Sequence, residues 1–463
     1  MSDPLSLPVA ELTERYRKKD LSPLEVTRAA LDRIGKLNPL YNAFCVVGEE
    51  SALRAARESE ARWQRGTPLG LVDGVPTTVK DLLWVKGWPT LRGSRSIARN
   101  QPWDEDSASV SRLREQGAVF LGKTTTSEFG WKGVTDSPLT GLTINPWNKF
   151  STPGGSSGGA AVAAALAMGN LHVGTDGGGS IRIPAGFCGV FGFKPTWGLV
   201  PVYPHSPAFT LWHQGPLSRN VADAAWMLSV ISHPDERDWA AAPPLDIDYR
   251  VGLEAGVRGL RMAYSPTLGF ARVEPEIAAR VERGVNEYAQ LGAIVEQIDL
   301  GLDDPIAIMK PLWAVALALA VAPMTPAERA LCDPPMLELA EQGFHLSALE
   351  YRQLEREREA LGRRMNLLYQ DYDLLITPQM PITAFAAGHN VPPGSGMHAW
   401  WQWSPFTYLF NLTQQPAATV PCGFAKDGLP VAMQLVGAKF SDRQVLRAAR
   451  AYEKMHPFVM PQP

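Results

Sequence analysis

The chain has 463 residues, of which 45% are hydrophobic, so it can bury a large core and form one large enzyme domain or two to three ordinary domains. Its formal net charge of −3 at pH 7 is nearly balanced, which argues against a nucleic-acid-binding surface and a polybasic membrane anchor. Residues 1–20 contain no apolar signal core. We therefore expect a cytoplasmic chain that binds neither nucleic acid nor membrane.

Cysteine and histidine spacing argues against two further classes. The four cysteines are scattered and form no C-x-x-C pair, so reduced thiols are expected rather than a disulfide framework or a zinc ribbon. The eight histidines include no H-E-x-x-H motif. We therefore expect neither a catalytic metal nor another cofactor.

The N-terminal segment, residues 1–66, is predicted to be helical. Ser22 is followed by Pro23 and Glu25, the pattern of a capping box with proline at the first helical position. A second helix is expected over residues 51–65, and Gly66 is expected to end it.

Short β-prone runs alternate with helical segments over residues 67–230, the region that also holds the chemical motifs. Alternation of this kind indicates βαβ units and a mostly parallel sheet. Strands are expected at 74–80, 118–124 and 171–175, and helices at 104–117, 159–169 and from 180 onward.

The second half of the chain is predicted to contain a helical insertion and the strands that complete the sheet. The insertion covers residues 303–372, and its apolar run at 314–322 is too short to cross a bilayer. Strands are expected at 259–265, at 373–378 and twice more within 373–463. The predicted fold is one α/β domain over residues 1–463, with a central, mostly parallel, twisted mixed sheet covered by helices.

Three segments carry candidate chemistry: Lys80 in GVPTTVKD, the loop PGGSSGG at 153–159 and the loop GTDGGGSIR at 174–182. A serine between small residues can face a substrate directly, and a lysine in an apolar strand is a candidate base. Consecutive glycine N–H groups can bind a developing oxyanion. Together the segments predict nucleophilic catalysis.

Two other interpretations of the glycine loops are weaker. Residues 155–159 match the G-x-S-x-G nucleophile elbow, but loop-like residues precede them. No histidine lies in an informative context, since His205 and His213 fall in a predicted aromatic loop. No G-K-[ST] or G-x-G-x-x-G motif follows a strand, so a phosphate site is not expected.

The three motifs, in this order, resemble those of the amidase signature family of serine hydrolases. Similar stretches occur at 144–148, at 187–198 and in the last fifty residues, so the resemblance covers nearly the whole chain. It implies the amidase signature fold and a serine–serine–lysine triad. By motif position Ser180 is the nucleophile, Ser156 is the bridging serine that the family holds in a cis peptide, and Lys80 is the base. The implied oxyanion hole consists of the N–H groups of Gly177, Gly178, Gly179 and Ser180.

Four neighbours are expected to support the triad. Ser157 is small, which permits the cis backbone expected at Ser156. Asp176 and Arg182 flank the nucleophile and are expected to pair and brace its loop. Thr175 either hydrogen-bonds to the bridging serine or is an ordinary turn residue.

Lys80 must be uncharged to accept a proton. A free lysine has a pKa of about 10.4, so roughly one in a thousand is neutral near pH 7.4. Val79, Leu82 and Leu83 supply an apolar environment that lowers the pKa of the lysine. Asp81 would oppose this effect, but strand alternation directs its side chain to the opposite face.

Tryptophans near the motifs suggest an aromatic substrate pocket. Trp131, Trp84 and Trp212, together with Gly130, are the candidate lining residues, and packing in the core is the alternative role for the tryptophans. The tryptophans at 400–403 are weaker candidates. Gly177 stands where relatives often carry a larger apolar residue, so we expect a looser loop or a wider site.

The expected function is cleavage of the C–N bond of a small, hydrophobic or aryl amide through an acyl-enzyme, with carbamates (urethanes) and esters as further candidates. The alternative is the glutamine-hydrolysing A subunit of a tRNA-dependent amidotransferase. That subunit usually has Ser-Leu-Asp before a Gly-Pro, whereas here the segment reads FTLWHQGP, with His213 in place of an aspartate. A catalytically silent binding protein has little support, because all three triad positions are present. The expected partner is a small-molecule amide or carbamate, and the chain is expected to be a monomer or homodimer.

Overall fold

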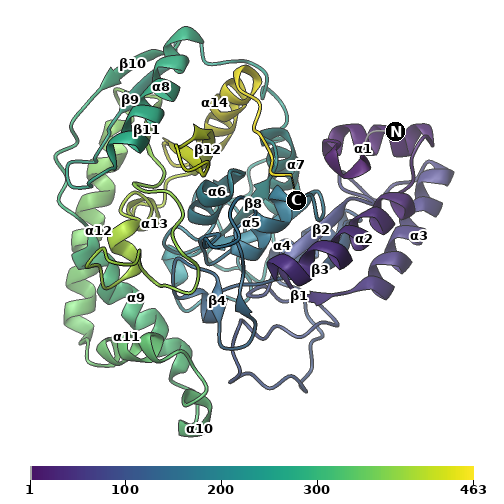
Figure 1. The fold of residues 1–463 in the computed structure, drawn as a ribbon, viewed down its shortest axis with the longest axis horizontal. Coiled ribbons are helices and arrows are strands. Elements are labelled where there is room, and N and C mark those ends of the chain that lie inside the picture. Colours follow the sequence, from purple (N-terminus) through teal and green to yellow (C-terminus); the bar gives the residue numbers. More distant parts are fainter. Residues whose placement is uncertain (1–2, 463) are drawn as a thin grey trace.

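An eleven-stranded sheet runs through the molecule (Figure 1). The computed structural model describes residues 3–462. The strands of this sheet are β1 (Phe44–Val47), β2 (Pro76–Lys80), β3 (Val119–Thr124), β6 (Leu171–Asp176), β7 (Phe191–Lys194), β8 (His213–Ser218), β9 (Arg261–Tyr264), β10 (Ile294–Gln297), β11 (Leu374–Pro378), β12 (Ala417–Phe424) and β13 (Pro430–Gly437). Their spatial order is β1-β3-β2-β6-β8-β7-β12-β13-β11-β9-β10. A separate hairpin joins β4 (Asp136–Ser137) to β5 (Gly141–Leu142).

Parallel pairing occurs in two blocks of this sheet. β2 pairs in parallel with β3 and β6, and β9 pairs in parallel with β10 and β11. Antiparallel pairs through β8, β7, β12 and β13 join the two blocks. The predicted α/β fold with a mixed sheet is therefore confirmed. The first block brings the C-terminal ends of β2 and β6 to one edge of the sheet, because parallel strands share their direction.

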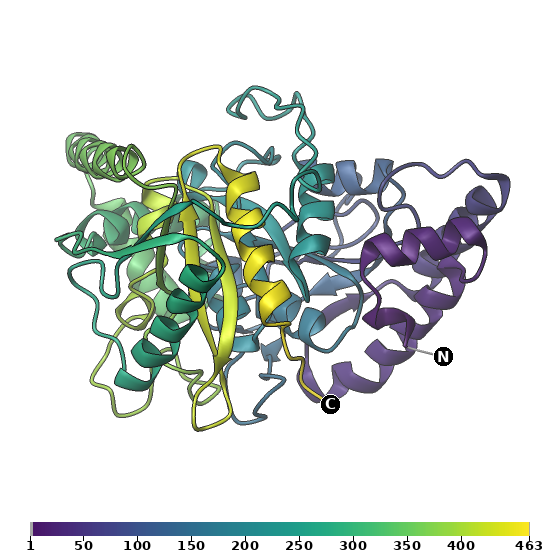
Figure 2. The same cartoon turned by 90° about the horizontal axis from the view of Figure 1, so that it is seen from above.

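Helices surround the sheet. α1 (Val9–Lys18), α2 (Pro23–Tyr41) and α3 (Glu49–Arg65) lie at one end of the molecule, and the green helices of residues 306–368 lie at the other, as Figure 2 also shows. The remaining helices are α4 (Ala108–Glu115), α5 (Gly158–Ala165), α6 (Arg182–Cys188), α7 (Val221–Ile231), α8 (Pro275–Gln290), α9 (Ile306–Val321), α10 (Pro326–Arg329), α11 (Pro334–Phe344), α12 (Ala348–Leu368), α13 (Leu409–Leu412) and α14 (Asp442–Met455).

Strand alternation explains why both faces of the sheet are covered. On β11, Leu374 and Ile376 belong to the hydrophobic core that includes residues of α7, α8 and α14. Leu375, between them, belongs to a different core that includes residues of α12 and α13. Since successive strand residues point to opposite faces, a strand buried on both sides must be apolar at every position.

Local signals predicted the start of α2 and the end of α3 correctly. The N–H of Glu25 donates to the Ser22 hydroxyl at 3.2 Å, and the Ser22 N–H donates to the Glu25 carboxylate at 2.7 Å, which completes the capping box of α2. α3 ends at Arg65, and Gly66 follows with φ +75°.

Four strands of the large sheet, β1, β7, β8 and β10, were not anticipated. β1 interrupts the N-terminal segment that was expected to be helical, because it pairs with the edge of β3. His213 is not a loop residue as expected, because it opens β8, which pairs with β6 and β7.

Helix α9 of the insertion lies against the second glycine loop at Gly177. α9 and α11 cross so closely that a Cβ atom on Gly343 would collide with the carbonyl group of Ala314. This close approach requires glycine and fixes the position of α9. Trp313, one residue before Ala314, is thereby held against the second glycine loop.

Candidate active site

Lys80 is the last residue of β2 and is fully buried. Its Nζ lies 2.7 Å from Ser156 Oγ, 2.8 Å from Ser157 Oγ and 2.9 Å from Thr175 Oγ1. The parallel pairing of β2 with β6 explains the approach of Thr175, since Val79 lies opposite Val173 in that register. The structure therefore surrounds the amine with three hydroxyl groups.

The charge state of Lys80 follows from this environment. Burial lowers its pKa well below the ordinary value, and the more distant Asp176 carboxylate opposes that effect. The neighbouring Asp81 does not reach it, because Asp81 forms an ion pair with Lys123 at 2.7 Å. The Asp81 carboxylate therefore points away from the Lys80 amine, as predicted.

Ser156 and Ser180 lie on the two glycine loops. The Gly155–Ser156 peptide bond is cis. Ser156 is almost fully buried, whereas Ser180 keeps 8% of its surface exposed. The backbone N–H of Ser157 donates to the carbonyl oxygen of Ser180 at 3.1 Å and so ties the loops together. Within residues 3–462 no hydrogen bond joins the hydroxyl groups of Ser156 and Ser180.

The glycines of the second loop do not all remain free to bind an oxyanion. The N–H of Gly179 donates to the Asp176 carboxylate at 2.7 Å, so the structure removes Gly179 from the predicted donors. The N–H groups of Gly177, Gly178 and Ser180 have no hydrogen-bond acceptor in the described part of the chain. Three backbone donors therefore remain beside the serine.

Thr175 lies on the predicted strand but has neither of the two roles considered for it, a bond to the bridging serine or an ordinary turn residue. Its hydroxyl contacts Lys80 and not the bridging serine, so the expectation of a bond to Ser156 is corrected. The reason is its place on β6, which points the side chain across to the end of β2. Ser157 completes this arrangement, since its hydroxyl donates to the carbonyl oxygen of Thr175 at 3.1 Å.

Asp176 and Arg182 pair as expected and are both fully buried. Their N–O distances are 3.0 Å, and the Asp176 carboxylate also accepts from the Asn411 amide at 2.9 Å. Burial alone would raise the pKa of Asp176, but the Arg182 guanidinium holds it below the usual range. Arg182 donates further to the side chain of Gln434 at 2.8 Å. The loop that carries Ser180 is thus fixed by charged hydrogen bonds.

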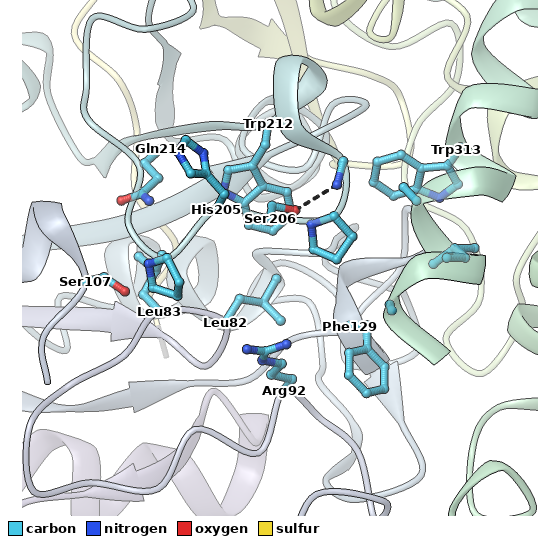
Figure 3. Close-up of a pocket in the computed structure, with 16 residues that line it drawn as sticks. Leu82, Leu83, Arg92, Ser107, Phe129, His205, Ser206, Trp212, Gln214 and Trp313 are labelled. Atoms are coloured by element: carbon cyan, nitrogen blue, oxygen red, sulfur yellow. Dashed lines mark hydrogen bonds between the residues drawn. The ribbon is translucent and has the colours of Figure 1, made fainter. Parts of the chain in front are cut away.

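A cavity with mainly apolar walls adjoins this cluster (Figure 3). Trp212 and Trp313 line it, and both approach Gly177: a Cβ atom there would lie 2.8 Å from the Trp313 ring and 3.6 Å from that of Trp212. On the opposite side, Gly130 lies between Leu82, which lines the cavity, and Ser156. The cavity therefore begins beside the serine loops.

Three of the four predicted pocket residues, Trp131, Trp84 and Gly130, do not line this cavity. The indole N–H of Trp131 donates to the Asp333 carboxylate at 3.0 Å, which anchors the ring elsewhere. Trp84 makes an edge-on contact with Tyr203, at 6.3 Å between ring centres. Both tryptophans therefore pack against the protein, while Trp212 is a true wall of the cavity.

The wider site that was expected at Gly177 is not found. The space beside it is filled by Trp313, and the space that a Cβ on Gly178 would need is filled by Trp400, at 2.7 Å. Trp313 and Trp400 contact each other edge-on, with 6.4 Å between their ring centres, so two indoles pack against the second glycine loop. Trp403 lies deeper and stacks on Phe187.

Trp313 and Arg92, the latter also in the cavity wall, were missed from the sequence. Trp313 lies in an apolar helical stretch that predicts only burial. Arg92 lies in a loop without a recognisable motif. Neither carries a local signal, because the wall forms only when distant segments pack together.

Within residues 3–462, no group of three or more His, Cys, Asp or Glu side chains is arranged to hold a metal ion. In the same part of the chain, no helix is both long enough and apolar enough to cross a bilayer. The four cysteines are free thiols.

Comparisons with known proteins agree with this geometry. The family model described as Amidase matches residues 25–446, and the chain therefore belongs to the amidase, or amidase signature, family. The chain is 34% identical to an acylamidase of Rhodococcus erythropolis, over 99% of this chain and 97% of that protein. It is 35% identical to the A subunit of the glutamyl-tRNA(Gln) amidotransferase of Myxococcus xanthus, over 98% of both chains. The structure of a bacterial aryl acylamidase of the amidase signature family superposes with a TM-score of 0.91 and 29% identity, covering 97% of this chain and 96% of the other.

Proposed function

We propose that this amidase signature hydrolase cleaves small hydrophobic or aryl amides through an acyl-enzyme on Ser180. The observation that carries the proposal is the buried amine of Lys80, which lies 2.7 Å from Ser156 Oγ. Lys80 forms no ion pair with any residue in 3–462, so no contacting carboxylate holds its proton. A buried lysine with a lowered pKa is suited to act as a general base.

The proposed reaction uses the two serines in sequence. Ser180 Oγ bonds to the substrate carbonyl carbon while its proton passes to Ser156, whose own proton passes to Lys80. The N–H groups of Gly177, Gly178 and Ser180 bind the oxyanion. The proton then returns by the same route to the leaving nitrogen as the C–N bond breaks. Water then bonds to the acyl carbon while its proton passes along the same route to Lys80, and the proton returns to Ser180 Oγ as the bond to the acid breaks.

Carbamates and esters are proposed as further substrates. The acyl-transfer steps are common to all three classes, and a carbamate differs from an amide by the oxygen on the far side of its carbonyl group. A panel containing an anilide, a carbamate, an ester and a primary amide will rank them by kcat/KM. We expect the isolated chain to hydrolyse the anilide.

The role assignment is tested by Ser180→Ala and Lys80→Ala. Each variant is expected to lose on the order of 10⁴-fold or more in kcat while keeping the far-ultraviolet circular dichroism of the wild type. Lys18→Ala, an exposed lysine in α1, is the matched control and should keep full activity. Wild-type rates in either triad variant would refute the assignment.

A rise of kcat/KM with pH is expected, because only uncharged Lys80 accepts a proton. The rise should occur at the lowered pKa of Lys80, well below 10.5, and should be insensitive to chelators. A pH–rate profile of the anilide from pH 5 to pH 10 measures it. A profile that is flat, or that falls over this range, would contradict a lysine base.

An amidotransferase A subunit is the second candidate, because relatives with that name match the chain at similar identity. One observation disfavours it: His213, at the position expected to hold an aspartate, is buried. Burial lowers the pKa of His213 well below its ordinary value, so the ring is uncharged and cannot replace a carboxylate. Glutamine hydrolysis that requires partner subunits and tRNA would support this candidate, and hydrolysis of an anilide without them would support the first.

A further inference from the structure

Among the described residues, Arg92 is the one Lys or Arg side chain that lines the cavity, and its backbone conformation is unusual. Its φ is +54°, in the left-handed region that favours glycine or asparagine. The backbone is anchored from the cavity side, because the N–H of Phe129 donates to the Arg92 carbonyl oxygen at 2.8 Å. Figure 3 shows the guanidinium beside Leu82, with Phe129 close by. A costly backbone conformation therefore places a cation in a mainly apolar wall.

The guanidinium of Arg92 has no protein partner within residues 3–462: it forms no ion pair and donates no hydrogen bond there. The carboxylate that attracts the Arg92 guanidinium electrostatically is that of Asp81, and this carboxylate is already paired with Lys123 at 2.7 Å. A guanidinium has five N–H donors and does not lose its charge in proteins. A half-buried guanidinium that faces a cavity and is free of protein partners is suited to bind an anion that enters the cavity.

The surroundings restrict which anion fits. The neighbouring walls include Leu82, Phe129 and Leu317, which suit a hydrocarbon chain or ring. The nearest histidine in the lining, His205, is turned toward Asp238 at 3.2 Å. A single guanidinium matches a singly charged carboxylate through two parallel hydrogen bonds, whereas a phosphate dianion would need more positive charge.

We propose that Arg92 binds a carboxylate on the substrate, so that the preferred substrates are amides in which one half is a hydrophobic chain or ring ending in a carboxylate. The inference rests on the proposed function, since it assigns this cavity to the same reaction. It makes Arg92 a specificity-determining residue that selects substrate by charge. The scissile bond would lie at the Gly177 end of the cavity, where Trp212 and Trp313 meet the serine loops.

Three probes test this assignment. Hexananilide is neutral, adipic acid monoanilide carries a carboxylate at the end of its acyl half, and 4-(hexanoylamino)benzoate carries one on its amine half. KM and kcat are measured for the wild type, Arg92→Met, Arg92→Lys and Arg95→Met. Arg95 is the matched control, because it is exposed on the same loop and does not line the cavity.

For the wild type, one of the two carboxylate amides should have a KM about 10- to 100-fold below that of hexananilide, the range expected for a charge-assisted hydrogen bond. Arg92→Met should abolish most of this KM ratio with a smaller effect on the kcat ratio. Arg92→Lys should retain part of it, since an ammonium keeps the charge without the fork. Arg95→Met should behave as the wild type.

Equal KM values for the three probes in the wild type, or an equal loss on all three in Arg92→Met, would overturn the proposal. Calorimetric binding of the same probes to Ser180→Ala, with and without Arg92→Met, separates it from the proposed function. If no probe is turned over but a carboxylate amide binds Ser180→Ala through Arg92, the hydrolase assignment fails and the anion site stands. If hexananilide is hydrolysed and neither carboxylate amide is preferred, the hydrolase assignment stands and the anion site fails.

Discussion

The contacts of a buried lysine decide what it can do. Burial lowers the pKa of Lys80, Lys123 and Lys194 alike, and desolvation is the main cause in each case. Lys123, however, pairs with the Asp81 carboxylate, and Lys194 donates to backbone carbonyl oxygens, at 3.1 Å in the case of Pro195. Lys80 contacts hydroxyl groups alone, which can both give and accept a proton. Of these three lysines, Lys80 therefore has the contacts best suited to proton transfer.

The lowered pKa of Lys80 also predicts how stability depends on pH. Between that lowered pKa and about 10.4, the unfolded chain holds a proton on Lys80 that the folded chain lacks. In this window the free energy of unfolding of the wild type, relative to Lys80→Met, should rise with pH by up to about 1.4 kcal/mol per unit. Below the window both states are protonated, and the difference should become constant.

Urea unfolding of both proteins at several pH values from 6 to 10 measures this difference. Lys18→Met, at an exposed site in α1, supplies the control and should follow the wild type at every pH. If the curves of the wild type and Lys80→Met run parallel across the range, Lys80 is charged in the folded protein, and the proposed base is wrong.

At the scale of elements, α9 forms a wall of the site although it is more than a hundred residues from the serine loops. Its residue Trp313 donates from its indole N–H to the Trp131 carbonyl oxygen at 3.0 Å and covers Gly177. The crossing of α9 with α11, which requires Gly343, sets its depth. The helical insertion is thus part of the proposed active site.

This packing predicts a rescue between two substitutions. Gly177→Ala places a methyl group 2.8 Å from the Trp313 ring and should displace the oxyanion loop, lowering kcat/KM about 10²-fold. Adding Trp313→Ala should recover most of that loss, because the clash disappears. Gly178→Ala is the matched comparison: its methyl group meets Trp400 at 2.7 Å, so Trp313→Ala should not rescue it.

A double-mutant cycle on kcat/KM, with thermal unfolding in parallel, checks this prediction. Strict additivity of Gly177→Ala and Trp313→Ala would show that the ring and the loop are independent. Equal rescue of Gly178→Ala would show that Trp313→Ala acts by a general loosening of the site.

At the scale of the whole molecule, the Asp176–Arg182 pair joins the first parallel block to the C-terminal strands. Arg182 contacts Gln434 on β13, and both members of the pair contact Asn411 on α13. These residues are 229 to 252 positions from Arg182 or 235 from Asp176 along the chain. The site therefore depends on the closed fold of nearly the whole chain, in agreement with a family match over residues 25–446.

Breaking this pair should destabilise the entire domain. Asp176→Asn leaves the buried Arg182 without its counter-charge, and removal of one partner of a buried pair typically costs about 3–5 kcal/mol. Glu11→Gln removes the exposed partner of Arg15 and should cost no more than about 1 kcal/mol. Denaturant unfolding of both variants measures the contrast. If Asp176→Asn lowers the free energy of unfolding by less than about 1 kcal/mol, the pair does not stabilise the whole domain.

Two of the four strands that were not predicted from the sequence, β8 and β10, lack the local pattern of a strand. β8 reads HQGPLS, so glycine, proline and polar residues hide it from any alternation of apolar side chains. β10 is a four-residue edge strand whose residues are largely exposed. Strands of this kind form because a neighbouring strand offers hydrogen bonds, and that neighbour is distant in sequence.

The sequence by itself determined the family, the α/β class, the start of α2, the end of α3 and the motif positions of Lys80, Ser156 and Ser180. Each of these depends on short-range pattern: capping residues, apolar periodicity and glycine-rich motifs. Tertiary structure alone decided that Gly179 is bound by Asp176, that Trp313 closes the space at Gly177, and that Arg92 enters the cavity without a partner. These features arise where segments far apart in the chain are packed to contact distance, and local sequence does not encode which side chains meet there.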